Sequence, residues 1–229
     1  RRLYPYTYNL HKCLLDVSGK PIINYQLEAL ENLGIYDVTM ITGYYRESLM
    51  EHVTNSFPSL NFDFLINHHY FETNTAYSLY LAREKFISDD QVLLNADVVY
   101  PKELLKRIVN SIFENVLAVD VKSCGREEVK VIEGAGQKIV DIGKNLIEAQ
   151  CLGEFIGVAK LSRSFAGMLI GTLEQLINAG GKNDYFEAGI QPLLSKVDVY
   201  FEDVSEFPCL EIDFIEDLES ARQIFINKK

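Results

Sequence analysis

Several features are missing or scarce in this sequence of 229 residues. It contains no tryptophan, so the side chain whose ring binds cations most strongly is not available. Its four cysteines are scattered and form no C-x-x-C pair, which argues against a zinc site and a disulfide framework. No apolar stretch is long enough to span a membrane, and no signal peptide is visible. We therefore expect a reduced, cytoplasmic setting and no membrane partner.

Positive charge is also in the minority. The 33 acidic residues outnumber the 22 basic residues, which gives a net charge of -11 and a pI near 4.9. Nucleic acids and anionic membranes bind basic surfaces, so we expect neither as a partner. Apolar residues are plentiful: they make up 48% of the chain, with 11% aromatics, and suffice for a substantial core. The length suits one large α/β domain or two small ones.

Strand-like and helix-like segments alternate through the first half of the chain. Pro21 opens and Gly34 closes a helical segment with an apolar face of Ile23, Leu27 and Leu30. The same reasoning predicts strands at 37–44, 61–67, 91–99 and 116–121, and helices at 45–55, 75–86 and 101–113. This order predicts an α/β fold with a doubly wound, mostly parallel, Rossmann-like sheet and right-handed crossovers.

The alternation ends near residue 124. Residues 127–144 predict a β-hairpin that turns at Gly134 to Gly136. Beyond it we expect a strand at 154–161, helices at 162–179, 185–195 and 214–225, and two short strands before the last helix. Since no linker or repeat interrupts the chain, we expect one domain, residues 1–229, with a small inserted β-hairpin and helical region that binds substrate.

One acidic residue stands at the end of an apolar segment. Asp97 follows the run 91–94 and lies within the sequence NADVV. It suits a turn, because Asn and Asp hydrogen-bond their own backbone where a strand stops. It also suits a metal ligand, because open α/β sheets bind ligands beyond the carboxyl ends of their strands. The residues alone leave both interpretations open.

An ordered set of residues opens the chain. It consists of Arg2-Leu3, Pro5, Thr7, Lys12 and Gly19-Lys20-Pro21. In order and spacing this set resembles the N-terminal motif of the nucleotidyltransferase (NTP transferase) superfamily, in which R-L-x-P-x-T precedes P-K and then G-K-P. His11 stands where that family usually has a proline. The family's N-terminal strand and Gly-rich loop are missing before Arg1, so we expect an N-terminal piece that carries them.

Four later segments extend the resemblance over nearly the whole chain: 73–82, 142–146, 153–162 and 210–221. They look like the phosphocholine cytidylyltransferase branch, which includes relatives that act on 2-aminoethylphosphonate. The resemblance implies transfer of a cytidylyl group from CTP to a small phosphorylated or phosphonate zwitterion (phosphocholine or 2-aminoethylphosphonate), with release of pyrophosphate. Two alternatives stay open: a sugar-1-phosphate uridylyl- or thymidylyltransferase, and a catalytically silent regulatory domain of the same fold.

The resemblance also gives roles to charged residues. Asp97 and Asp213 would hold Mg²⁺, although Asp213 also stands where a helix N-cap is expected. Arg2 and Lys12 would hold the triphosphate, and Lys144 would bind the phosphates where donor and acceptor meet. A solvated surface charge is the alternative for each of these cations. Because the attacking oxygen is already anionic, catalysis needs positioning and positive charge rather than a general base.

The remaining candidates would contact the base and the acceptor. Asn74 and Thr75 would read the pyrimidine edge, or would cap a helix. A cationic acceptor nitrogen calls for carboxylates and aromatic faces, and the candidates for these are Glu154, Tyr185, Phe186 and Glu187. The alternative is a buried aromatic stripe with solvated acids. Glu154 heads an apolar strand, where an acid is costly unless something pairs with it.

Overall fold

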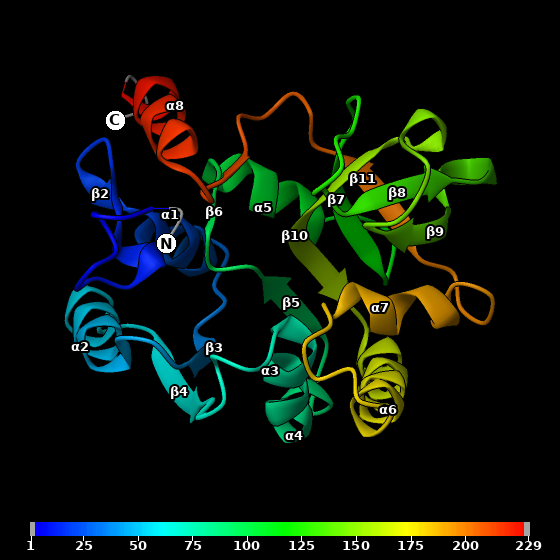
Figure 1. Ribbon diagram of the computed structural model, residues 1–229, viewed down its shortest axis with the longest axis horizontal. Helices are drawn as coiled ribbons and strands as arrows, with labels where there is room; N and C mark the ends of the chain where they lie inside the picture. Colours follow the sequence, from blue (N-terminus) through cyan, green and yellow to red (C-terminus); the bar gives the residue numbers. More distant parts are fainter. Residues whose placement is uncertain (1–2, 227–229) are drawn as a thin grey trace.

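The structure of the chain is a computed structural model that describes residues 3–226 (Figure 1). Its α-helices are α1 (Ile22–Asn32), α2 (Arg46–Ser56), α3 (Thr75–Leu81), α4 (Arg83–Phe86), α5 (Lys102–Val109), α6 (Arg163–Asn178), α7 (Glu187–Ile190) and α8 (Ile215–Phe225). Short 3₁₀ helices are η1 (Lys12–Leu14), η2 (Ala135–Gln137), η3 (Glu148–Gln150) and η4 (Gln191–Leu193). The strands are β1 (Asp16–Val17), β2 (Lys20–Pro21), β3 (Asp37–Thr42), β4 (Asn61–Ile66), β5 (Gln91–Leu94), β6 (Val98–Val99), β7 (Val116–Asp120), β8 (Lys130–Glu133), β9 (Ile139–Gly143), β10 (Gly153–Leu161), β11 (Tyr200–Asp203) and β12 (Leu210–Glu211).

The helix boundaries follow local chemistry. Pro21 precedes the first turn of α1, and the predicted apolar face of Ile23, Leu27 and Leu30 is buried, which confirms that helix. The predicted helix at 75–86 is divided, because Ala82 leaves helical geometry and separates α3 from α4. None of the helices within residues 3–226 is long and apolar enough to cross a membrane.

The chain has an α/β fold, but the expectation of a mostly parallel sheet is wrong. Parallel pairing joins β3 to β4 and β7 to β11. The long strand β10 lies between β5 and β7 and is antiparallel to both, and the hairpin of β8 and β9 adds further antiparallel strands beside it. The apolar pattern of a strand shows which faces are buried but carries no information about its direction.

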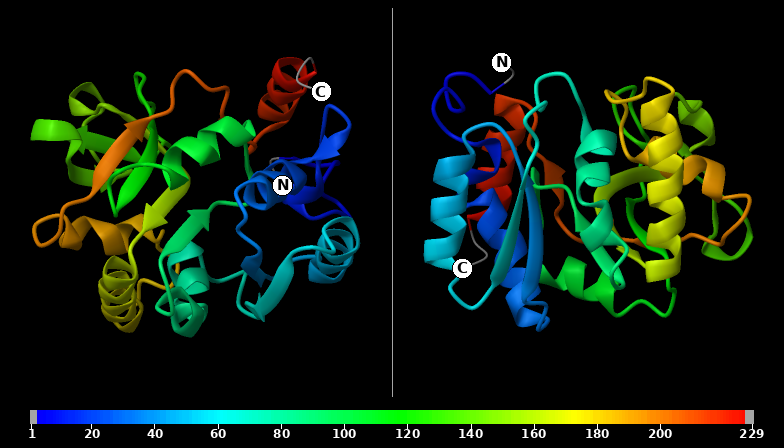
Figure 2. Two further views of the ribbon diagram at one scale, coloured as in Figure 1. Left: turned by 180° about the vertical axis from the view of Figure 1, so that it is seen from behind. Right: turned by 90° about the horizontal axis from the view of Figure 1, so that it is seen from below.

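Helices cover both faces of these strands. In β7, Val116 and Ala118 belong to the core that contains α1, α2 and α5, whereas Leu117 and Val119 belong to the core that contains α3, α6 and α7. Figure 1 shows α5 above β5 and β10, and α3 and α6 below them. A third, smaller core holds α8 against the N-terminal segment. The two segments lie side by side in both views of Figure 2.

The predicted strand at 91–99 is broken at the point where the site forms. Residues 95–97 make a turn between β5 and β6, and β12 pairs with β6 in antiparallel register. The turn packs on Gly157 of β10, where φ is +75° and an added Cβ would lie 2.3 Å from Asn95 Nδ2. Glycine is therefore needed at 157 both for its backbone conformation and for the close approach of Asn95.

A groove separates β3 from β5. Among the described residues, β3 pairs with β4 alone and β5 with β10 alone, so each strand leaves an edge without a neighbour. The groove has a volume of about 500 Å³ and is lined by 37–41 and 90–96, with side chains of α1 and α3 over it. The groove adjoins a larger pocket, because both are lined by Thr75, Asn95 and Ala96.

Candidate active site

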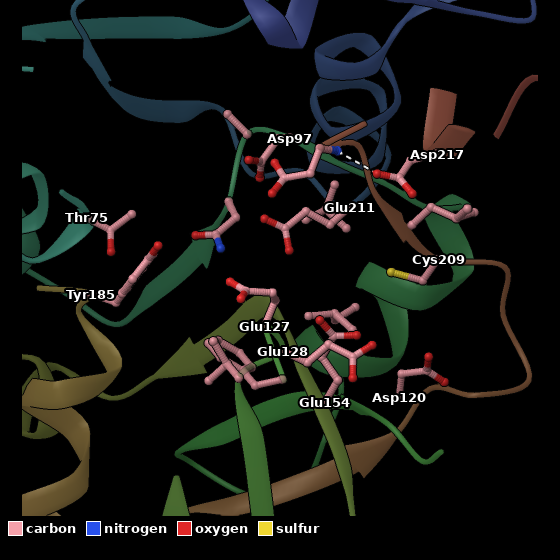
Figure 3. Close-up of a pocket in the computed structure, with 18 of the residues that line it drawn as sticks. Thr75, Asp97, Asp120, Glu127, Glu128, Glu154, Tyr185, Cys209, Glu211 and Asp217 are labelled. Atoms are coloured by element: carbon pink, nitrogen blue, oxygen red, sulfur yellow. Dashed lines mark hydrogen bonds between the residues drawn. The ribbon is translucent and has the colours of Figure 1, made fainter. Parts of the chain in front are cut away.

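A pocket of about 670 Å³ lies beyond the end of β5 (Figure 3). It brings together nine of the residues singled out in the sequence: Lys12, Asn74, Thr75, Asp97, Lys144, Glu154, Tyr185, Glu187 and Asp213. Arg2 lies outside the described residues. Phe186 lies in the described part of the chain but does not line this pocket.

Lys12 joins the two aspartates expected to hold a metal. Its Nζ lies 2.8 Å from Asp97 Oδ2 and 2.5 Å from Asp213 Oδ1. Burial by itself lowers the pKa of Lys12, but the two carboxylates outweigh it and raise the pKa above its ordinary value. The ammonium is therefore a fixed positive charge held between two anionic groups.

Asp213 lies beside Asp97 and just before α8. The pairing of β12 with β6 brings it beside Asp97, and Ile212 N–H donates to Asp97 O over 3.0 Å. The N-cap of α8 is Phe214, and Asp217 Oδ2 accepts hydrogen bonds from the backbone N–H groups of Asp213 and Phe214. The N-cap expected at Asp213 therefore falls one residue later, at Phe214, and the Asp213 carboxylate contacts Lys12.

Glu211 is a pocket residue that the sequence reasoning missed. Oxygens of Asp97, Glu211 and Asp213 all lie within 4.8 Å of one another. Desolvation in the pocket raises the pKa of Glu211 to about 7, the charges of Asp97 and Asp213 add to this, and Lys12 opposes it. The signal was available, since residues two apart in an extended segment point to the same side and Glu211 lies two before Asp213.

This donor set fits a magnesium ion. Mg²⁺ prefers oxygen ligands and is ordinarily held by one or two carboxylates, with water and phosphate oxygens completing its shell. Three converging carboxylates supply that chemistry, and the Lys12 ammonium already places positive charge between two of them. Asp97 lies in a turn, as one interpretation expected, and it belongs to this acidic cluster, so its role as a metal ligand stays a prediction.

Lys144, Tyr185 and Glu187 form the far side of the pocket. Lys144 follows β9, and its Nζ lies 4.1 Å from the centre of the Tyr185 ring. Glu187 begins α7 and is only 4% exposed. Burial raises the pKa of Glu187 to about 7, while a backbone hydrogen bond and the charge of Lys144 oppose the shift.

Asn74 and Thr75 begin α3 near Tyr185, as Figure 3 shows for Thr75. Asn74 Oδ1 accepts the N–H of Thr75 over 2.8 Å, and Thr75 Oγ1 accepts the N–H of Phe186 over 3.0 Å. Both side-chain oxygens therefore tie the start of α3 together and to the segment before α7. This is the cap interpretation of the pair, and both residues still line the pocket.

Glu154 has the partner that its place in an apolar strand demands. Lys122 Nζ lies 2.7 Å from Glu154 Oε2, and it also pairs with Asp120 at 3.2 Å and Glu128 at 3.4 Å. Burial raises the pKa of Glu154, and Lys122 opposes that shift. The sequence reasoning required a partner but did not identify Lys122, which lies 32 positions away in the chain.

The two phenylalanines belong to the core. Phe155 and Phe186 are 3% and 2% exposed, and their rings meet edge to face with centres 6.0 Å apart. The expectation that Phe186 contacts substrate is therefore withdrawn: its ring is covered by other apolar side chains. These two residues therefore form part of a buried aromatic stripe, which was the alternative to a role in substrate binding.

The charges of the pocket define what it can bind. Nine carboxylates line it, against the three lysines Lys12, Lys122 and Lys144. A triphosphate would be repelled by this surface unless cations accompanied it, because like charges in a partly desolvated site destabilise one another. The pocket therefore suits a phosphate-bearing ligand that brings a divalent cation.

The chain is similar to known proteins in both sequence and structure. The family model for nucleotidyl transferases matches residues 1–129. The CTP:phosphoglutamine cytidylyltransferase of Campylobacter jejuni is 27% identical, over 95% of this chain and 93% of its own length. The choline-phosphate cytidylyltransferase of Streptococcus pneumoniae is 25% identical, over 99% and 94%. The solved structure of CTP:phosphocholine cytidylyltransferase from Streptococcus pneumoniae superimposes with a TM-score of 0.82 at 23% identity, over 98% of this chain and 93% of that one.

Proposed function

The chain belongs to the nucleotidyl transferase family, and on that premise we propose that it transfers a cytidylyl group from CTP to a small phosphorylated or phosphonate zwitterion. The family makes it a nucleotidyltransferase. The cytidylyl donor and phosphorylated acceptor are supported by similarity to cytidylyltransferases along nearly its whole length. Phosphocholine and 2-aminoethylphosphonate are the acceptors that we propose, and pyrophosphate is the second product.

One observation carries this proposal: Lys12, Asp97 and Asp213 meet at one end of a pocket whose other end holds Lys144 and Glu187. An enzyme of this kind must hold a nucleoside triphosphate and a phosphate-bearing acceptor side by side. The metal-binding carboxylates and Lys12 suit the triphosphate, and Lys144 suits the acceptor phosphate. A silent domain would have no need to keep all of these groups converging on one space.

The residues present suggest how the pocket assists the reaction. A magnesium ion bound by Asp97, Asp213 and Glu211 would supply positive charge to the phosphates. Lys12 binds phosphate oxygens once released from its two aspartates, and it stabilises negative charge that develops at the reacting phosphorus. Lys144 orients the acceptor's anionic oxygen, so no side chain has to remove a proton. Asn74 and Thr75, which line the pocket, would contact the pyrimidine edge.

We also propose that the single domain includes an N-terminal strand and a Gly-rich loop ahead of Arg1. The groove between β3 and β5 supports this, because it offers two strand edges and apolar walls to one extended segment, and because it leads to Asn95 and Ala96 at the pocket. Amide hydrogen exchange should be slower at 38–41 and 92–94 in a chain extended upstream than in residues 1–229. Equal exchange in the two chains would contradict the proposal.

Pyrophosphate release tests the function directly. CTP, UTP, dTTP and ATP would each be offered with phosphocholine, phosphoethanolamine, 2-aminoethylphosphonate and glucose-1-phosphate in the presence of Mg²⁺. We expect turnover with CTP and a zwitterionic acceptor. Preference for glucose-1-phosphate would contradict the proposal of a zwitterionic acceptor. Absence of turnover with every pair, measured with the extended chain, would contradict the proposal that the protein is an active enzyme.

A further inference from the structure

We infer that the acceptor carries its positive charge on a nitrogen that still bears hydrogen, and that Glu187 binds this N–H group. The inference rests on the proposed function and selects among its acceptors: a protonated amine is preferred to a quaternary ammonium such as that of phosphocholine.

The first observation is an unsatisfied carboxylate oxygen. Within the described residues, Glu187 Oε2 is buried and has no hydrogen-bond partner, and the side chain lines the pocket. A buried acceptor without a donor destabilises the structure that contains it. A ligand that donates a hydrogen bond to this oxygen removes that penalty, whereas a ligand with only methyl groups on nitrogen leaves it in place.

The second observation concerns aromatic rings. A quaternary ammonium is held by several ring faces that surround it. Among the described residues, the aromatic residues that line the pocket are Phe155, Tyr185 and Phe214. Phe155 is packed edge to face against Phe186 in the core, and Phe214 lies at the opposite end beside Asp213. Tyr185 is 41% exposed and offers a single ring, and Lys144 Nζ already lies over that ring. The pocket does not present an aromatic cage.

The other acids at this side of the pocket are less suited to bind the acceptor's N–H group. Glu154 is engaged by Lys122 at 2.7 Å, and Asp120 and Glu128 share the same ammonium. Glu187 is close enough to Lys144 for that charge to influence its pKa, but the two side chains form no ion pair within the described residues. An acceptor with its phosphate on Lys144 and its ammonium on Glu187 would therefore be short, with the two charges separated by a few bonds.

A methylation series tests the inference. The substrates are phosphoethanolamine, its N-methyl and N,N-dimethyl derivatives, and phosphocholine, each with saturating CTP and Mg²⁺. The first three keep at least one N–H when protonated, and the last has none. We expect kcat/KM to fall about tenfold to a hundredfold at the last methylation, the loss typical of a buried acceptor left without a donor.

Variants connect the series to Glu187. Glu187→Gln keeps the shape but not the charge, and it should lower kcat/KM for phosphoethanolamine far more than for phosphocholine, so that the series becomes flat. Glu133→Gln, at an exposed position of β8, is the matched control and should keep the wild-type series. Phosphocholine as the best acceptor, or a series unchanged in Glu187→Gln, would overturn the inference while leaving cytidylyl transfer intact. No turnover with any acceptor would overturn both.

Discussion

The buried carboxyl of Glu187 should make the stability of the free protein depend on pH in a way that one substitution removes. Burial raises the pKa of Glu187 from 4.5 to about 7, with Lys144 opposing. Since the folded pKa lies above the unfolded one, protonation favours the folded state. The stability from this group is fully present below pH 4.5 and is lost as the pH rises through 7.

The magnitude follows from the same two pKa values. At about 1.4 kcal/mol for each tenfold change in proton affinity, ionising the buried carboxyl costs about 3–4 kcal/mol in total. Part of that cost is already present at pH 5, so the change in unfolding free energy between pH 5 and pH 8 is about 2–3 kcal/mol for this group. Glu187→Gln cannot ionise and should lack this contribution.

Urea unfolding at pH 5 and pH 8 measures the effect as a double difference. Between the two pH values the wild type should lose about 2–3 kcal/mol more than Glu187→Gln does. Other titrating groups, Glu211 included, are present in both proteins and cancel. Glu133→Gln should follow the wild type. If wild type and Glu187→Gln gave parallel stability at the two pH values, Glu187 would not be a buried carboxyl without a donor, and the inference about the acceptor would lose its first support.

Three further outcomes are expected. Asp97→Asn and Asp213→Asn should each reduce pyrophosphate release more than a hundredfold while the melting temperature stays within a few degrees, because the amide keeps the shape of the side chain and Lys12 keeps the other aspartate as its ion-pair partner. Folded variants with normal activity would show that neither binds the metal. Lys12→Ala should lower kcat far more than it raises KM, as expected for a contact that strengthens in the transition state, whereas a rise in KM alone would make Lys12 a simple phosphate anchor. Gly157→Ala places a Cβ 2.3 Å from Asn95 Nδ2 in a left-handed conformation, so urea unfolding should show a loss of about 1–3 kcal/mol; a variant as stable as wild type would contradict the close packing of that turn.

The sequence alone determined the features that depend on neighbouring residues. The apolar spacing of 22–32 and the Pro21 start located α1, and Gly134 to Gly136 located the hairpin turn. The ordered motif around Lys12 pointed to nucleotidyl transfer through its resemblance to a known family. The helix and turn signals lie within a few residues of the place they describe, where propensity, capping and periodicity act.

The tertiary structure decided which distant residues meet. Lys12 contacts partners 85 and 201 positions away. The reversed direction of β10, the partnership of Glu154 with Lys122, the place of Glu211 in the acidic cluster and the burial of Phe186 all depend on how strands pair across the sheet. A short apolar or acidic segment looks the same in the sequence whichever neighbour it will have, because its pattern records which side is to be buried and not what will cover it.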